Sequence, residues 1–326
     1  MTGRRSVWSD PRVIELTKDF TPATDEVWRL QTQKHADCLF FQQMSRHGHY
    51  GDDPEHSQQG IYVCSPSGKF LASINSNSAD RVMRMMQRGL DAWEKLPEEE
   101  RKLPADAEIK AAHRWEDSYP EGGLVISVVT RDLPSNCDPD ADCEVKWNRD
   151  FIWFSKEEAR SWIPDYPAAD VVHEIPRDLA QRITRFHLVD TVNGQTTPYR
   201  REDVEDTTIS TRITDIKADG TNEGGIVELE IFGSTKTNSP GRQRRESPHG
   251  VVTRLLGHAK FDFTKMAFVE FEMVALGRRW GYTQFNFRRN EEEQGPLGYV
   301  FKLASEKTPR VAPAFIYAYD ADWVKR

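Results

Sequence analysis

Four histidine and cysteine side chains in the N-terminal part of the chain are of the types that bind transition metals. His35 and Cys38 are three residues apart, and one glycine separates His47 from His49. Imidazole nitrogen and thiolate sulfur suit zinc or copper. A zinc or copper site at these residues is therefore one hypothesis. The alternative is that these residues are surface histidines and a buried cysteine that acts as a small apolar side chain. We prefer this alternative, which requires no cofactor, because no paired Cys-x-x-Cys spacing is present.

Cys38 is also the candidate for a catalytic thiol. A reactive thiolate needs a helix N-terminus or a nearby cation, and His35 and Arg46 lie within sequence reach of Cys38. Cys64 lies beside Val63 in an apolar run, which indicates an inert position. A thiol- or metal-dependent function that uses Cys38 with the three histidines at 35, 47 and 49 is the alternative that the sequence leaves open.

The stretch from Asn136 to Glu144 alternates carboxylates with other residues, a pattern that can hold calcium. Cys143 stands where an EF-hand loop needs glycine. We therefore interpret the stretch as a solvated acidic turn, in which Cys137 and Cys143 would form a disulfide only in an oxidising compartment.

Arginines cluster near the C-terminal end of the chain, beside an aromatic residue and an asparagine. Such clusters can grip a phosphate or a carboxylate. The candidate ligand-binding residues are Arg278, Arg279, Asn286 and Arg288. The arginines can equally pair with the three glutamates at 291–293, and this is the use that we prefer.

The elements that would position the N-terminal candidates have a clear local pattern. Ile61–Cys64 has strand composition, and a Pro- and Gly-containing turn at 65–68 leads to a return strand over Phe70–Ile74. Apolar residues then recur at three- and four-residue steps from Val82 to Leu96, which predicts an amphipathic helix.

This region resembles the second half of the thioredoxin superfamily. The resemblance covers roughly residues 8–96: SDPRVIELTKDFTPAT matches the family's helix and strand, the latter over Phe20–Val27, and SPSGKFLAS matches its Pro-x-Gly-Lys hairpin. The family's Cys-x-x-Cys is absent, and Gln59–Tyr62 stands where its cis-proline is expected. The resemblance therefore implies a thioredoxin-like α/β module without the usual dithiol exchange.

Short alternating apolar segments dominate the C-terminal part. The segments are Ile209–Ile216, Ile226–Phe232, Val251–Leu256, Ala259–Phe263, Phe268–Val274, Tyr282–Phe287 and Tyr299–Leu303. Such alternation predicts an antiparallel sheet with one solvated face, arranged as a sandwich or barrel. The predicted fold class is α+β, with three parts: a thioredoxin-like module over 1–97, a linker and mixed α/β segment over 98–175, and a β-rich domain over 176–326.

Composition limits the function classes. The 326 residues carry a formal net charge of −8, which disfavours nucleic acid as a partner. No apolar window is long enough to span a bilayer, and no signal peptide is recognisable, so we expect a cytoplasmic protein unless a leader has been removed. The predicted function is binding of a small apolar ligand or a protein partner, with Phe261, Phe271 and Phe287 as candidates to line a pocket in the β-rich domain.

Overall fold

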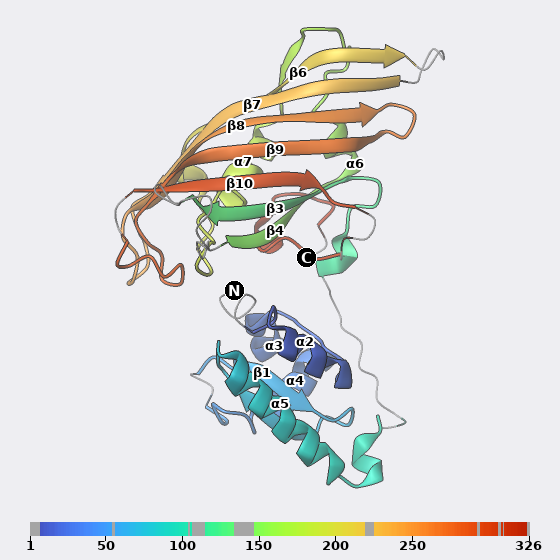
Figure 1. The fold of residues 1–326 in the computed structure, drawn as a ribbon, viewed down its shortest axis with the longest axis vertical. Coiled ribbons are helices and arrows are strands. Elements are labelled where there is room, and N and C mark those ends of the chain that lie inside the picture. Colours follow the sequence, from blue (N-terminus) through green and yellow to red (C-terminus); the bar gives the residue numbers. More distant parts are fainter. Residues whose placement is uncertain are drawn as a thin grey trace. The chain divides into compact units, whose positions relative to one another are not determined.

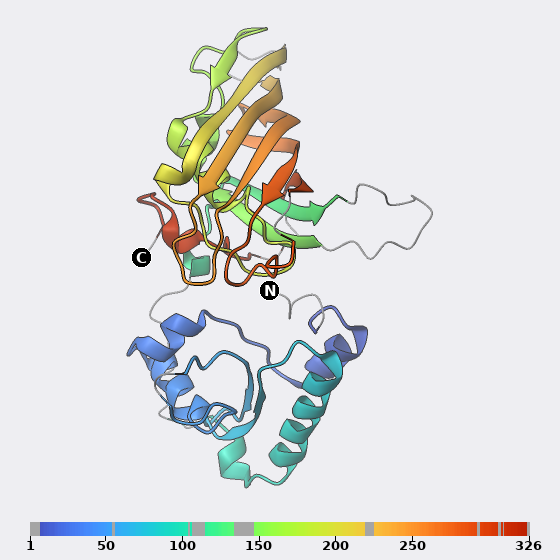
Figure 2. The ribbon, with the colours of Figure 1, turned by 90° about the vertical axis from the view of Figure 1, so that its left-hand side faces the viewer.

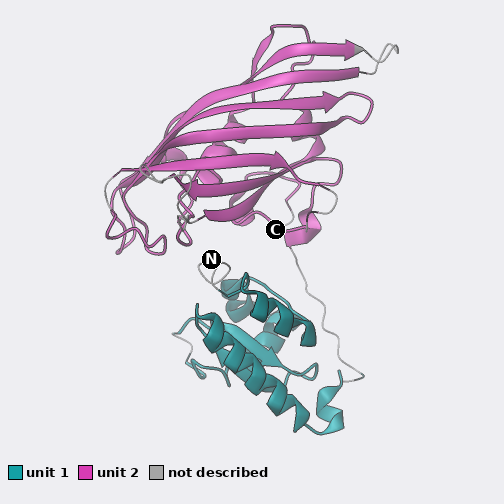
Figure 3. Ribbon diagram, viewed as in Figure 1, with its two compact units in different colours: residues 1–114 teal, residues 115–326 magenta. Residues whose placement is uncertain are grey.

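A computed structural model describes most of the chain. The described residues are 7–53, 56–103, 105, 115–133, 147–218, 225–291, 294–305, 308 and 310–324. The chain divides into two compact units, residues 1–114 and 115–326 (Figure 3). The sequence predicts a separate segment over 98–175, which the observed division does not have. The strands of that segment belong to the sheet of the second unit. The acidic stretch from Asn136 to Glu144 lies outside the described residues.

The first unit combines short helices with a β-hairpin. Its elements are α2 (Pro11–Leu16), η1 (Thr17–Asp19), α3 (Val27–Thr32), α4 (Ala36–Ser45), β1 (Ile61–Cys64), β2 (Phe70–Ile74), α5 (Ala79–Glu94) and η2 (Glu98–Arg101). The predicted hairpin and the helix after it are confirmed, with β1 and β2 antiparallel. The strand predicted over Phe20–Val27 is wrong. Val27 begins α3 instead, because the Glu26 carboxylate caps that helix by accepting hydrogen bonds from two backbone N–H groups.

The apolar face of α5 packs on the hairpin. Val82, Met85 and Met86 of α5 are buried with Val63 of β1 and Ala72 of β2. This core confirms the periodicity read from the sequence, and it leaves the charged face of α5 exposed. A thioredoxin-like fold for the unit stays a prediction.

The second unit is built on one large sheet. Its elements are η3 (Trp115–Ser118), β3 (Leu124–Asp132), β4 (Trp147–Phe154), α6 (Lys156–Arg160), β5 (Val172–Glu174), α7 (Arg177–Phe186), η4 (Arg201–Asp203), β6 (Val204–Ala218), β7 (Gly225–Ser239), β8 (His249–Asp262), β9 (Ala267–Trp280), β10 (Gly295–Leu303) and η5 (Ile316–Ala318). Eight strands pair in the order β4-β3-β10-β9-β8-β7-β6-β5 (Figure 1). All these pairs are antiparallel.

The single sheet corrects the predicted sandwich or barrel. Its outermost strands β4 and β5 do not pair with each other, so the sheet is not closed, and helices rather than a second sheet cover its inner face (Figure 2). The strands are also longer than predicted. Val251–Leu256 and the residues from Ala259 to Asp262 belong to the single strand β8, while Tyr282–Phe287 forms no strand.

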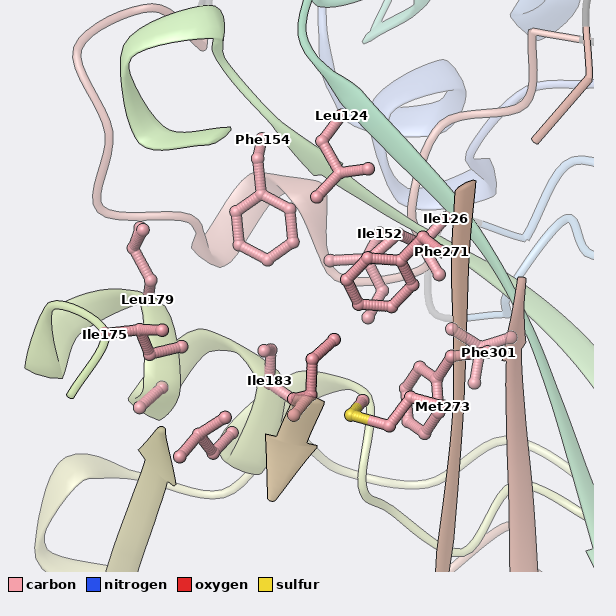
Figure 4. Close-up of a cluster of buried hydrophobic side chains, with 14 of the residues drawn as sticks. Leu124, Ile126, Ile152, Phe154, Ile175, Leu179, Ile183, Phe271, Met273 and Phe301 are labelled. Carbon is pink, nitrogen blue, oxygen red and sulfur yellow. The ribbon is translucent and has the colours of Figure 1, made fainter. Parts of the chain in front are cut away.

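The core of the second unit lies between the sheet and α7. Alternate residues of the strands point inward, among them Phe271, Met273 and Phe301, and they face Leu179 and Ile183 of α7 (Figure 4). This hydrophobic layer explains why one face of each strand is apolar.

The three phenylalanines predicted to line an apolar pocket in this unit do not lie together. Phe261 and Phe271 are buried, and the Phe268 ring packs edge-on against both, at centroid distances of 5.2 and 5.8 Å. Phe287 is 66% exposed. The three phenylalanines therefore do not line one pocket, because two fill the core and the third points to solvent.

Candidate functional site

A groove on the first unit brings together side chains from three parts of its chain. It has a volume of about 610 Å³. The loop after α4, the strand β2 and the polar face of α5 form its walls. The lining residues are His47, Gly48, His49, Phe70, Leu71, Ala72, Ser73, Arg88, Asp91, Ala92 and Lys95.

His49 is held in the groove by hydrogen bonds on both ring nitrogens. Its Nε2 lies 3.1 Å from the carbonyl oxygen of Gln59, and its Nδ1 lies 2.9 Å from the hydroxyl of Ser73. A carbonyl only accepts, so the neutral ring carries its proton on Nε2, and the Ser73 hydroxyl donates to Nδ1. The backbone N–H of His49 donates to the same hydroxyl oxygen, at 2.9 Å. Ser73 therefore anchors both the backbone and the ring of His49.

Two glycines allow this loop to pack closely on the hairpin. A Cβ atom on Gly48 would stand 2.5 Å from Cε1 of Tyr62, and one on Gly60 would stand 2.4 Å from Cε1 of His49. The Tyr62 ring lies 5.2 Å from the His49 ring, and its hydroxyl donates to the Gln58 carbonyl at 2.9 Å. Burial, with a smaller contribution from Tyr50, raises the pKa of Tyr62 to about 12. Tyr62 thus supports the loop as a neutral side chain.

The cations of the groove come from one face of α5 and from its C-cap residue, Lys95. Arg88 lies seven residues before Lys95, a spacing of about two helical turns. Both side chains are exposed, and neither forms an ion pair with any residue that the structure describes. Asp91 lines the groove between them, and its carboxylate accepts from Gln87 at 3.0 Å. Arg88 and Lys95 therefore form no ion pair with a described residue, and together with Asp91 they leave the groove lining with one positive charge.

Such an arrangement can bind an anion. Guanidinium and ammonium groups donate several hydrogen bonds to phosphate or carboxylate oxygens. The groove also contains the two imidazoles and the apolar stretch Phe70–Ala72 of β2. The apolar wall offers contact to a nonpolar part of the same ligand.

Cys38 lies away from this groove. It is fully buried in α4, whereas His35 is exposed before the start of that helix. Burial raises the pKa of the Cys38 thiol, although the charge of Arg29 acts in the opposite direction. Cys64 has a raised pKa for the same reason, burial. A neutral, buried thiol at Cys38 is a poor nucleophile.

The predicted metal ligands are not assembled as a cluster. Among the described residues, no group of three or more His, Cys, Asp or Glu side chains can hold a metal ion. His47 and His49 line the groove, but Cys38 and His35 do not. Two of the four predicted ligands therefore lie in the groove, and the other two lie in α4 or directly before it.

The predicted arginine cluster also separates. Arg278 points to the exposed face of β9, while Arg279 and Arg288 are buried. Arg288 binds Asp132 at 2.7 and 2.9 Å and Asp190 at 2.9 and 3.1 Å. These carboxylates use the donors that a ligand would need.

The exposed Glu291 and the buried Asn286 complete this network. The Glu291 carboxylate lies 2.7 Å from Nη1 of Arg288 and 2.8 Å from Nη2 of Arg279, which confirms the predicted pairing of the arginines with glutamate. Asn286 accepts from the backbone N–H groups of Thr283 and Arg288. Glu292 and Glu293 lie outside the described residues. The network is a structural clamp.

Sequence reasoning identified the two histidines of the groove and missed Ser73, Arg88 and Lys95. The signal for the cations was the spacing of basic residues on the polar face of α5, which places Arg81, Arg84, Arg88 and Lys95 on one side of the helix. Ser73 had no such signal, because only the folded hairpin brings it to His49.

None of the helices in the described part of the chain is long and apolar enough to cross a bilayer. No family model, curated protein or solved structure matches the chain.

Proposed function

We propose that this protein is a binding protein whose first unit holds a small anionic ligand, a phosphate or a carboxylate, in the groove between α5 and the 47–49 loop. The observation that carries the proposal is the position of Arg88 and Lys95. Both cations line a groove with His47 and His49, and neither pairs with a described carboxylate.

The other side chains that line the groove indicate further chemical features of the ligand. The Asp91 carboxylate would repel a second negative group and accept a hydrogen bond from a hydroxyl or amino group. Ala72 and Leu71 provide apolar contact. A small molecule with one anionic group, a neighbouring hydrogen-bond donor and a short apolar part would match these features.

The scaffold of this proposal is a thioredoxin-like module that has no dithiol. Its hairpin supplies Ser73 and its closing helix supplies the cations. In this proposal the module keeps the hairpin and helix of the thioredoxin superfamily, but binds an anion instead of exchanging disulfides. No observation favours the thiol- or metal-dependent alternative, because Cys38 is buried and lies outside the groove.

Calorimetric titration of the full chain with inorganic phosphate, and separately with acetate, tests the proposal. The double variant Arg88→Gln, Lys95→Gln should bind at least about tenfold more weakly, a change of about 1.4 kcal/mol. The matched control Arg81→Gln, Arg84→Gln removes two cations from the same helix but none from the groove, and should keep the affinity. Equal losses in both double variants, or no binding by the unmodified chain, would overturn the proposal.

A further inference from the structure

The face of the large sheet opposite α7, here called the outer face, carries a continuous row of apolar side chains. The strand register places Phe232 of β7 beside Leu256 of β8, Leu256 beside Val274 of β9, Val274 beside Val300 of β10, and Val300 beside Val129 of β3. The row crosses five neighbouring strands. In Figures 1 and 2, α6 and α7 lie on the other face.

The side chains of this row are unusually exposed for a sheet. Leu256 is 57% exposed, Val274 is 42% exposed and Val300 is 41% exposed. Leu276, two residues after Val274 on the same face, is 56% exposed. Isolated exposed apolar residues are ordinary, but a contiguous patch of them marks an interaction surface.

Charges flank the row asymmetrically. On one side stand Arg131, Arg254 and Arg278, none of which forms an ion pair with a described residue. On the other side stand four glutamates paired with four basic side chains. The glutamates are Glu228, Glu230, Glu270 and Glu272, and the basic residues are Arg212, Lys217, Lys260 and Lys302. One flank is therefore positive, and the other, the glutamate flank, is balanced in charge.

We propose that a second copy of this chain docks on the outer face, with a two-fold axis running along the apolar row. That axis places each residue of the row opposite the same residue of the second copy, so that Leu256 of one copy contacts Leu256 of the other. It also turns the positive flank of one copy onto the glutamate flank of the other. Arg278 and Glu270 stand four residues on either side of Val274, so the Arg278 of each copy meets the Glu270 of its mate. A patch of this kind is self-complementary, as an isologous interface requires.

The size of the patch suits such an interface. Five strands, each about 4.8 Å wide, and five side-chain rows, each about 6.8 Å wide, cover roughly 24 by 34 Å, or about 800 Å² in each copy. The total of about 1,600 Å² falls within the range of specific protein interfaces.

The mass of the full chain in solution tests the dimer, measured by sedimentation over a range of concentrations. We expect a dimer whose dissociation constant rises at least about tenfold in Leu256→Asp, because the axis buries two new carboxylates against each other. The matched control is Tyr166→Asp, which removes an apolar side chain that is 90% exposed but lies outside the face. A monomer at every concentration overturns the proposal, and so does equal weakening by both variants.

Cross-linking tests the position of the axis without relying on stability. Leu256→Cys should form a disulfide-linked dimer on oxidation, whereas Val252→Cys should not, because Val252 faces Lys260 of the mate in this arrangement. The unmodified chain is the control for its own cysteines. Charge reversal supplies a second readout: Arg278→Glu should weaken the dimer, and adding Glu270→Arg should restore it. Efficient cross-linking through Val252→Cys, or no restoration by the double reversal, contradicts the proposed axis.

Discussion

The hydroxyl oxygen of Ser73 lies 2.9 Å from Nδ1 of His49 and 2.9 Å from the backbone nitrogen of the same histidine. One strand side chain thus fixes both the position of the 47–49 loop and the orientation of an imidazole in the groove. The second ring nitrogen faces the Gln59 carbonyl, so the ring is restrained on both sides.

Ser73→Ala should therefore destabilise the first unit and weaken anion binding together. Losing the hydroxyl removes two hydrogen bonds, at a cost of about 1–2 kcal/mol of unfolding free energy. Thermal unfolding and phosphate titration measure the two effects. Ser73→Thr keeps the hydroxyl and should retain both properties, and Ser78→Ala removes a hydroxyl that makes no capping hydrogen bond. Unchanged phosphate affinity in Ser73→Ala would show that the His49 anchor is irrelevant to binding.

The stability of the first unit should fall in alkaline solution because of Tyr62. Burial raises the pKa of this tyrosine from about 10 to about 12, so its contribution to stability is fully present below pH 10 and is lost as the pH rises through 12. The loss amounts to roughly 2–3 kcal/mol at most, since one pKa unit corresponds to about 1.4 kcal/mol.

The variant Tyr62→Phe isolates this effect. At neutral pH it should be less stable than the unmodified chain, because the hydrogen bond to Gln58 is lost. The difference between the two proteins should narrow between pH 10 and 12, as followed by urea unfolding at each pH. A difference that stays constant over this range would show that Tyr62 does not titrate as proposed.

The strand content of the second unit followed from alternation, but its arrangement did not. In β9, Phe271 and Met273 face the core while Glu272 faces solvent, as the sequence pattern predicts. The number of sheets depends on contacts distant in the sequence, such as the pairing of β10 with both β3 and β9. Local periodicity contains no information on these contacts.

The break predicted within β8 has a local cause. Gly257 separates its two apolar segments, and glycine in a strand pattern usually indicates an interruption. In the structure a Cβ atom at this position would stand 2.5 Å from the Glu272 carbonyl oxygen. The glycine therefore permits a close approach of β9 and continues the strand.

The candidate site was predictable only in part, because contacts between residues distant in the sequence assemble it. His47 and His49 were recognised from their residue type, and Arg88 and Lys95 show their relationship only once α5 is placed against β2. Ser73 meets His49 across 24 residues of sequence. Residue type identifies candidates, and the fold selects among them.

Removing Arg288 should destabilise the second unit strongly. Arg288→Met leaves Asp190, whose side chain is 8% exposed, without its main partner, and breaking a buried ion pair costs about 3–5 kcal/mol. Arg289→Met is the matched control, because Arg289 is exposed and its loss should change stability by less than about 0.5 kcal/mol. Unfolding in guanidinium chloride measures both variants. Equal, small losses would contradict the description of this network as a structural clamp.

Cys38 should be unreactive in the folded protein. The thiol is fully buried and burial raises its pKa, so a thiol reagent should label Cys38 slowly unless denaturant is added. Mass spectrometry of labelled peptides resolves Cys38 from the other cysteines. Cys38→Ser should also leave phosphate affinity unchanged. Rapid labelling of native protein together with weaker binding by Cys38→Ser would revive the thiol-dependent alternative.

The most direct test of anion binding in the groove is a phosphate titration of the full chain followed by amide chemical shifts. We expect saturable shifts that centre on the 47–49 loop, Ser73 and the stretch from Arg88 to Lys95, and their disappearance in the double variant Arg88→Gln, Lys95→Gln. Shifts of equal size in that variant, or shifts spread over exposed basic residues elsewhere without saturation, would contradict the account.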